Sequence, residues 1–236
     1  WMSALSQLRL ERHADIAVIS GRDTLSAHFI SHLSDMTSDD PDAVRVVVLH
    51  PDAGVWSGFD GVTEAGDLFA GFAEIAQPTI AVLDGPTLGG GLELALAADI
   101  RVAASDCQIG LEALTVGFPR AGGLQRLTRA IGRSRATQLL LLEGQIDSAT
   151  ALDWGLVNLV ADNAFEAAWQ VAVSIASRGP IATRYAKDAI RHGLDMPLAQ
   201  ALHYETELTI LLQDTNDRAE GVDAFVNKRA PEFSGT

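Results

Sequence analysis

A glycine-rich turn between an apolar strand and a helix is the feature that most constrains this chain. An apolar run at residues 79–83 follows Pro78, three successive glycines stand at residues 89–91, and a helical run covers residues 92–98. Glycines let the backbone approach a ligand closely, and the first turn of a helix leaves N–H donors unpaired and carries a partial positive charge. The stretch therefore predicts a site for an anion or for an oxygen that becomes negative.

Two familiar phosphate-binding loops do not fit this spacing. A P-loop needs a lysine directly after Gly90, where Gly91 stands. A dinucleotide fingerprint that starts at Gly89 needs its third glycine where Leu94 stands. The alternative that stays open is a loop that only turns a corner, because glycine clusters are common in loops.

Composition narrows the class of protein. The 236 residues allow one large domain, or one domain with a helical appendage, and 47% of them are apolar. No apolar run approaches the ~20 residues of a membrane span, and no signal segment opens the chain. The single cysteine, Cys107, forms no intrachain disulfide and no multi-cysteine zinc site, which fits a cytoplasmic protein.

The charge balance bears on partners. With 17 Lys+Arg against 31 Asp+Glu, the net charge is −14, which argues against nucleic acid and anionic membranes. It does not exclude an anionic small ligand, because local donors can hold one against an unfavourable overall field.

Strands and helices alternate along the chain, which predicts an α/β fold with right-handed crossovers. A hairpin is expected at its start, followed by buried parallel strands. The predicted strands are residues 8–12, 16–19, 44–49, 79–83, 99–104, 108–110 and 156–160. Helices are predicted at residues 24–36, 68–76, 92–98, 124–131 and 136–142.

The last third of the chain reads as mainly helical. Breaks at residues 178–180 and 196–197 suggest a core of residues 1–177 and a helical region of residues 178–236. The helices predicted at 198–212 and 217–227 carry apolar stripes. Their leucines could pack on another subunit or on their own domain; they are Leu202, Leu208, Leu211 and Leu212.

A second glycine turn follows a buried strand at residues 57–60. Loops at the carboxyl ends of parallel strands form the ligand crevice of such sheets. This turn and the turn at 89–91 could each give one backbone N–H to a single oxygen, which would build an oxyanion hole. Losing one donor from such a hole typically costs ~3 kcal/mol of transition-state stabilisation.

Two glutamates follow glycine-containing segments after strands. Glu93 and Glu112 are nineteen positions apart and could face the same crevice. Paired carboxylates in a partly apolar cleft can share a proton, which gives one acid and one base. The alternative is that either is a solvated surface charge.

Other catalytic patterns are weak. His28, His32 and Asp35 have a spacing that could hold a metal, but a solvated polar helix face is the favoured interpretation, and we expect no metal site. The chain contains neither a Gly-x-Ser-x-Gly elbow nor His-Glu-x-x-His.

Several motifs together resemble the crotonase superfamily, the enoyl-CoA hydratase/isomerase family. The resemblance spans nearly the whole chain, and its middle blocks are specific for the superfamily but less so for the reaction. The matching stretches are residues 23–26, 57–60, 78–99, 112–127 and 224–233.

The resemblance implies roles for particular residues. Phe59 and Gly90 occupy the positions whose backbone N–H groups hold a thioester oxygen. Glu93 falls where one catalytic glutamate activates water, and Glu112 falls where the other protonates C2. The substrate-binding positions that it implies are Leu25, Asp60, Gly61, Val62, Gly89 and Lys228, the last meeting CoA phosphate, often from a neighbouring subunit.

The resemblance also implies a fold and an activity. It implies a spiral core of ββα turns with a C-terminal helical oligomerisation region, in homotrimers or homohexamers. Its ligands are acyl-CoA thioesters, with no cofactor beyond the CoA of the substrate. We expect hydration of a 2-enoyl-CoA; the alternatives are double-bond isomerisation, C–C cleavage, or acyl-CoA binding without catalysis.

The sequence departs from the family pattern at several points. The segment between Asp60 and Pro78 is shorter than expected, and it normally shapes the acyl pocket and its lid. Bulky Phe59 replaces a small residue, Arg120 replaces a glycine, and Leu111 replaces a proline. The choice of substrate therefore stays open.

Overall fold

The computed structural model describes residues 9–21, 43–51, 65–111 and 122–236. Its main element is a six-stranded sheet with the order β1-β2-β3-β4-β6-β9. β1 is antiparallel to β2, which confirms the predicted hairpin, and the other neighbouring strands are parallel. The strands are β1 (Arg9–His13), β2 (Ile16–Gly21), β3 (Val46–Pro51), β4 (Thr79–Leu83), β6 (Ile100–Ala104) and β9 (Leu159–Ala161).

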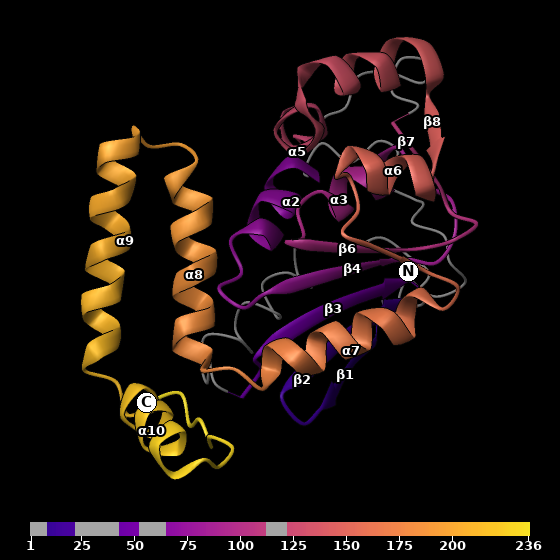
Figure 1. Ribbon diagram of the computed structural model, residues 1–236. Helices are drawn as coiled ribbons and strands as arrows, with labels where there is room; N and C mark the ends of the chain where they lie inside the picture. The colour runs from indigo at the N-terminus through magenta and orange to yellow at the C-terminus, as the bar shows by residue number, and fades with distance from the viewer. Residues whose placement is uncertain (1–8, 22–42, 52–64, 112–121) are drawn as a thin grey trace, which may run out of the picture.

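The central strands are continuous apolar runs because protein covers them on both sides. Every residue of β4 is buried, and so are residues 46–49 of β3. Helix α7 (Ala164–Ala176) packs against β2, β3, β4 and β6. In Figure 1, β3, β4 and β6 lie between α7 and the group formed by α2 (Ala65–Ala73), α3 (Gly90–Ala95) and α5 (Gly123–Gln138).

A second, small sheet has the order β5-β7-β8. Its strands are β5 (Thr87–Leu88), β7 (Gln108–Gly110) and β8 (Gln145–Asp147), with β5 parallel and β8 antiparallel to β7. A Cβ atom at Gly110 would lie 2.0 Å from the Gly144 carbonyl oxygen, so this sheet requires glycine there. The sequence predicted β7 but neither of its partners, which are too short to show a periodic pattern.

Helix boundaries differ from the predictions for identifiable reasons. Gly132, the predicted end of one helix, is a non-helical residue inside α5, with φ 79°. The chain then continues through the π-helix η2 (Leu139–Glu143) to Gly144. Helix α3 ends at Ala95 instead of the predicted 98. The buried Arg101 guanidinium donates to the Ala98 carbonyl at 2.7 Å and to the Ala95 carbonyl at 3.4 Å.

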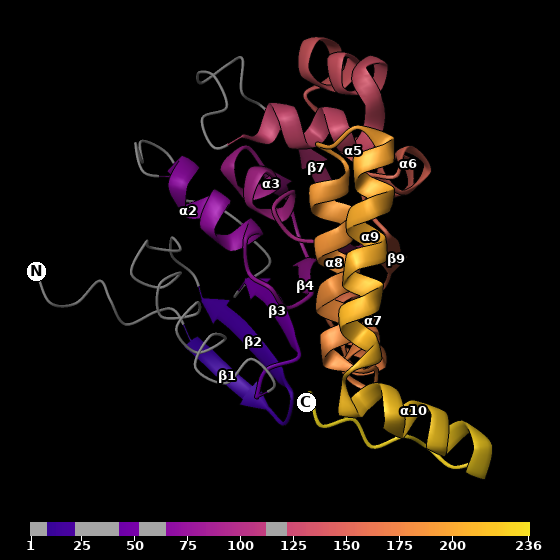
Figure 2. The same ribbon diagram turned by 90° about the vertical axis from the view of Figure 1, so that its left-hand side faces the viewer.

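The C-terminal third is helical, as predicted. After α6 (Ser148–Trp154) and α7, the chain forms α8 (Pro180–Gly193), α9 (Leu198–Gln213) and α10 (Asn216–Asn227). Figures 1 and 2 show α8 and α9 side by side along one flank of the core, with α10 at one end. The division into residues 1–177 and 178–236 as separate domains stays a prediction.

Polar contacts attach this helical region to the core. Lys187 of α8 donates to Asp99 Oδ2 at 2.7 Å and to the Gln77 carbonyl at 2.8 Å. Arg45, just before β3, donates to the Phe233 carbonyl at 2.7 Å. Asp217 in the first turn of α10 accepts the backbone N–H groups of residues 234 and 235. The C-terminal tail is thus tied both to α10 and to the sheet.

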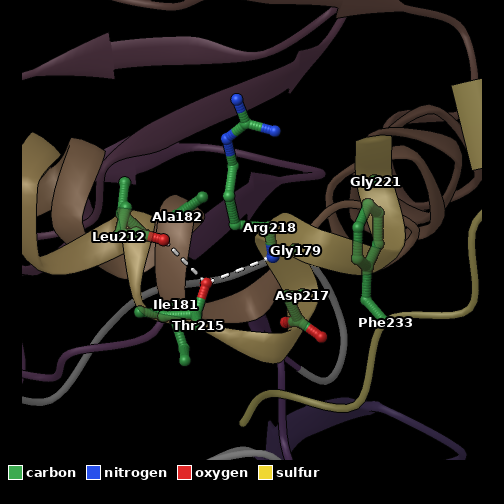
Figure 3. A pocket seen from close by; sticks show the side chains of 9 residues that line it. All are labelled: Gly179, Ile181, Ala182, Leu212, Thr215, Asp217, Arg218, Gly221 and Phe233. Atoms are coloured by element: carbon green, nitrogen blue, oxygen red, sulfur yellow. Dashed lines mark hydrogen bonds between the residues drawn. The ribbon is translucent and has the colours of Figure 1, made fainter. Parts of the chain in front are cut away.

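A small apolar cavity of about 230 Å³ lies where α8, α9 and α10 meet the tail. Figure 3 shows the Phe233 ring beside Gly221 at its edge, and the Thr215 hydroxyl bonded to the Leu212 carbonyl. A Cβ atom at Gly221 would be 3.6 Å from the ring, which is ordinary contact distance.

Candidate functional site

Glu93 is a buried carboxylate on α3. Its exposed fraction is 7%, and both neighbours in the sequence, Leu92 and Leu94, are buried. One carboxylate oxygen, Oε2, accepts a hydrogen bond of 2.9 Å from the backbone N–H of Gly123. Gly123 is the first residue of α5, so the carboxylate of one helix meets the N-terminus of another. The amide donor and the helix dipole both favour a negative charge there.

The glycine pair at the start of α5 makes this approach possible. Gly122 caps the helix in the left-handed region, with φ 86°. A Cβ atom at Gly123 would lie 2.5 Å from Glu93 Cγ and 2.8 Å from Oε2. Sequence reasoning placed a helix start here but missed the contact with Glu93, because nothing local in the sequence joins segments thirty residues apart.

Arg126, one turn further along α5, adds positive charge to the site. Burial lowers its pKa, and the negative charges of Glu93 and then Glu74 oppose that shift. The sequence analysis did not single out Arg126. In the sequence, Arg126 lies within the stretch 112–127 that resembles the family, but nothing there joins it to Glu93.

The predicted glycine turn leads directly into α3. Gly89 has φ 52°, a conformation that favours glycine, and its N–H donates to the Gly110 carbonyl at 3.0 Å. Gly90 is the first residue of α3, so its N–H belongs to the turn whose donors lack partners within the helix. The bond to Gly110 also brings β7, which leads toward Glu112, next to the turn.

Side chains fix the segment before the turn. The Cys107 thiol donates to the Gly85 carbonyl at 2.9 Å, and the Thr87 hydroxyl donates to the same oxygen at 3.0 Å. His50 at the end of β3 lies 2.5 Å from Asp84 at the end of β4, measured from Nε2 to Oδ2, and stacks on Phe165 of α7. The ends of these two neighbouring strands are therefore joined, and each precedes one of the two predicted glycine turns.

Most other predicted site residues lie outside the described residues. They are Leu25, Phe59, Asp60, Gly61, Val62 and Glu112. Lys228 is described: it is the exposed C-cap of α10, with φ 53°. Figures 1 and 2 show α10 beyond the lower end of α9 and well away from α3, so one chain does not bring Lys228 to Glu93. The meeting of two amides with two glutamates stays a prediction.

The described residues hold no group of three or more His, Cys, Asp and Glu arranged to bind a metal ion. The predicted but disfavoured cluster of His28, His32 and Asp35 lies outside those residues. Within the same part of the chain, no helix is both long enough and apolar enough to cross a membrane.

The family model for enoyl-CoA hydratase/isomerase matches residues 62–236. The chain belongs to the enoyl-CoA hydratase/isomerase family. It is 40% identical over 171 residues to the 2,3-dehydroadipyl-CoA hydratase of Escherichia coli, across 71% of this chain and 67% of that protein. It is 42% identical over 170 residues to human methylglutaconyl-CoA hydratase, mitochondrial, across 69% of this chain and 50% of that protein. The match thus spans about half to two thirds of these two relatives.

Solved structures support the same family. The crystal structure of an enoyl-CoA hydratase from Bacillus anthracis superimposes with a TM-score of 0.90, at 32% identity, covering 98% of this chain and all of that one. The predicted α/β crotonase fold with C-terminal helices is therefore confirmed.

Proposed function

We propose that this member of the enoyl-CoA hydratase/isomerase family adds water across the 2,3 double bond of a 2-enoyl-CoA thioester. The observation that carries the proposal is the buried Glu93 carboxylate, which accepts a hydrogen bond from the first amide of α5. Glu93 itself lies on α3, the helix that Gly90 begins. A negative side chain, able to take a proton, thus stands three residues from an amide able to stabilise an oxyanion. Both named relatives are hydratases of CoA esters, which supports hydration over other reactions of the family.

The division of labour follows from this arrangement. Glu93 removes a proton from water as the water oxygen attacks C3. The electron pair of the 2,3 double bond shifts toward C1, and negative charge develops on the thioester oxygen. The amides of Gly90 and Phe59 stabilise that oxygen. Glu112 then delivers a proton to C2 as the electrons return. The product carries the hydroxyl at C3 and the new hydrogen at C2, so atoms and charge balance.

Support for the place of Glu112 comes from β7. The strand pairs in parallel with β5, and Gly110 bonds Gly89 directly at the turn. Leu111, the last described residue before Glu112, is buried. The residues that come immediately before Glu112 therefore lie next to the glycine turn.

The CoA portion is proposed to lie along the remaining predicted positions. These are Leu25, Asp60, Gly61, Val62 and Gly89, with Lys228 meeting a CoA phosphate. Because α10 is distant from α3 in one chain, Lys228 would serve the site of a neighbouring subunit. We therefore propose a homotrimer or homohexamer, with no cofactor beyond the CoA of the substrate.

The test is the loss of crotonyl-CoA absorbance with wild-type protein and with Glu93→Gln and Glu112→Gln. The proposal expects turnover by wild type and a fall of about 10²-fold or more in each variant, because each removes one proton-transfer group. Circular dichroism would check that the variants are folded. Near-background rates in all three proteins would overturn the hydratase proposal.

A further inference from the structure

The environment of Glu93 assigns a part to a residue that the proposed mechanism does not use. Arg126 lies on α5, which packs against α3. Its guanidinium turns back toward the start of its own helix, because a Cβ atom at Gly122 would be 3.0 Å from Nη1. The Glu93 carboxylate lies on the adjacent residue, Gly123, at 2.9 Å from its N–H.

This placement is unfavourable for a cation taken alone. The first turn of α5 carries the positive end of the helix dipole, so a guanidinium folded over it is repelled. A carboxylate beside the guanidinium and the helix start makes the placement favourable, since its negative charge attracts both the guanidinium and the positive end of the dipole. The pKa of Arg126 reflects this: burial lowers it, and Glu93 is the first charge that opposes the shift.

We propose that Arg126 is a positioning residue that, together with the first turn of α5, holds the Glu93 side chain at the Gly123 amide. Glu93 is then ready to accept a proton, and the role of acid falls to Glu112. The role as base rests on the proposed function; the electrostatic coupling of Arg126 to Glu93 does not.

The other charged groups near this pair are few among the described residues. Glu74, just after α2, also attracts Arg126, but it is exposed and is held by Arg191 of α8 at 2.6 Å. The groups of α5 that face Glu93 are the Gly123 amide and the Arg126 guanidinium. Glu112, outside the described residues, is the remaining carboxyl predicted at this site.

The experiment compares Arg126→Met with Arg126→Lys, which keeps the charge, and with Arg129→Met as matched control. Arg129 lies on the same helix, but is exposed and pairs only loosely with Asp195, at 3.4 Å. In Arg126→Met the acid limb of the pH profile of kcat/KM should move up by about one pH unit, as expected when a cation beside a carboxylate is lost. Arg126→Lys and Arg129→Met should keep the wild-type limb. An unmoved limb in active Arg126→Met would overturn the inference.

A second readout is independent of turnover. With carboxyl-labelled glutamate, the NMR signal of Glu93 is identified by its loss in Glu93→Gln, and the pH at which it takes up a proton is followed. That pH should rise in Arg126→Met even if the wild type hydrates nothing, so failure of the proposed function is distinguishable from failure of this inference. If Arg126→Met does not fold, Arg126→Gln replaces it. A titration pH that does not rise in the folded variant would overturn the inference.

Discussion

Gly123 shows at the scale of one residue how tightly the site is built. The Cβ atom of an alanine there would lie 2.5 Å from Glu93 Cγ and 2.8 Å from Oε2, so the glutamate side chain or its helix must shift. We predict that Gly123→Ala costs about 1–3 kcal/mol of unfolding free energy and displaces the carboxylate. The matched control is Gly193→Ala, whose Cβ would meet Ala201 at 3.6 Å. Chemical denaturation and hydration rates check both, and wild-type behaviour of Gly123→Ala would contradict the geometry.

The buried thiol of Cys107 gives a prediction about pH. Burial raises its pKa to about 11, from a reference value of 9.0. Between these values the unfolded chain loses the proton while the folded chain keeps it, so the unfolding free energy falls as pH rises. We predict that the difference in unfolding free energy between wild type and Cys107→Ala shrinks from pH 9 to pH 11. A difference that stays constant over this range would show that the thiol titrates as in the unfolded chain.

At the scale of elements, Lys187 joins α8 to the sheet. Lys187 bonds Asp99, whose same oxygen also accepts the N–H and the hydroxyl of Thr79. Burial lowers the pKa of Lys187 and Asp99 opposes this; the Lys187 side chain is 10% exposed, whereas that of Asp99 is 32% exposed. We predict that Lys187→Met lowers the unfolding free energy by about 1–3 kcal/mol, because Asp99 loses its charged partner.

The control for Lys187 is a surface ion pair. Arg129→Met removes the 3.4 Å contact to the exposed Asp195, and exposed pairs contribute about 0–1 kcal/mol. Denaturant unfolding of both variants compares them. Equal effects would show that α8 does not depend on Lys187 for its attachment.

The sequence predicted long elements and missed short ones, for physical reasons. The strand at residues 79–83 matches β4 because a fully buried strand is a continuous apolar run with Pro78 at its edge. β5 and β8 have two and three residues and draw their pairing from β7, so no periodicity marks them. α3 ends earlier than predicted, and Arg101 bonds the Ala98 carbonyl beyond that end, a tertiary contact that no helix pattern in the sequence shows.

The same reasoning explains the site. The glycine turn and Glu93 were predictable because their spacing is local in the chain. The Gly123 amide and the Arg126 charge were not, because α3 and α5 meet only through tertiary packing.

At the scale of the whole molecule, the proposed assembly can be tested on the apolar faces of α8 and α9. Leu198 and Leu202 are 74% and 55% exposed, and they line a groove of about 560 Å³ between the two helices. Of the leucines that could pack on another subunit or on their own domain, Leu208 is buried in its own chain, whereas Leu202 and Leu211 are exposed.

We predict that wild type is a trimer or hexamer by light scattering, and that Leu198→Lys with Leu202→Lys gives a smaller species, because charges would be buried in the contact. Gln200→Lys, at an exposed polar position on the same helix, is the control and should leave the mass unchanged. A monomeric wild type would contradict the assembly and the cross-subunit role of Lys228.

The most direct test of the central claim follows the atoms of water into the product. Crotonyl-CoA is incubated with wild type and Glu93→Gln in ¹⁸O-labelled heavy water, and the product is analysed by mass spectrometry. Wild type should yield a product with one ¹⁸O at C3 and one deuterium at C2, and Glu93→Gln should yield almost none. A moved double bond without ¹⁸O, or equal labelling by both proteins, would contradict the account in which Glu93 delivers water to a thioester held at Gly90.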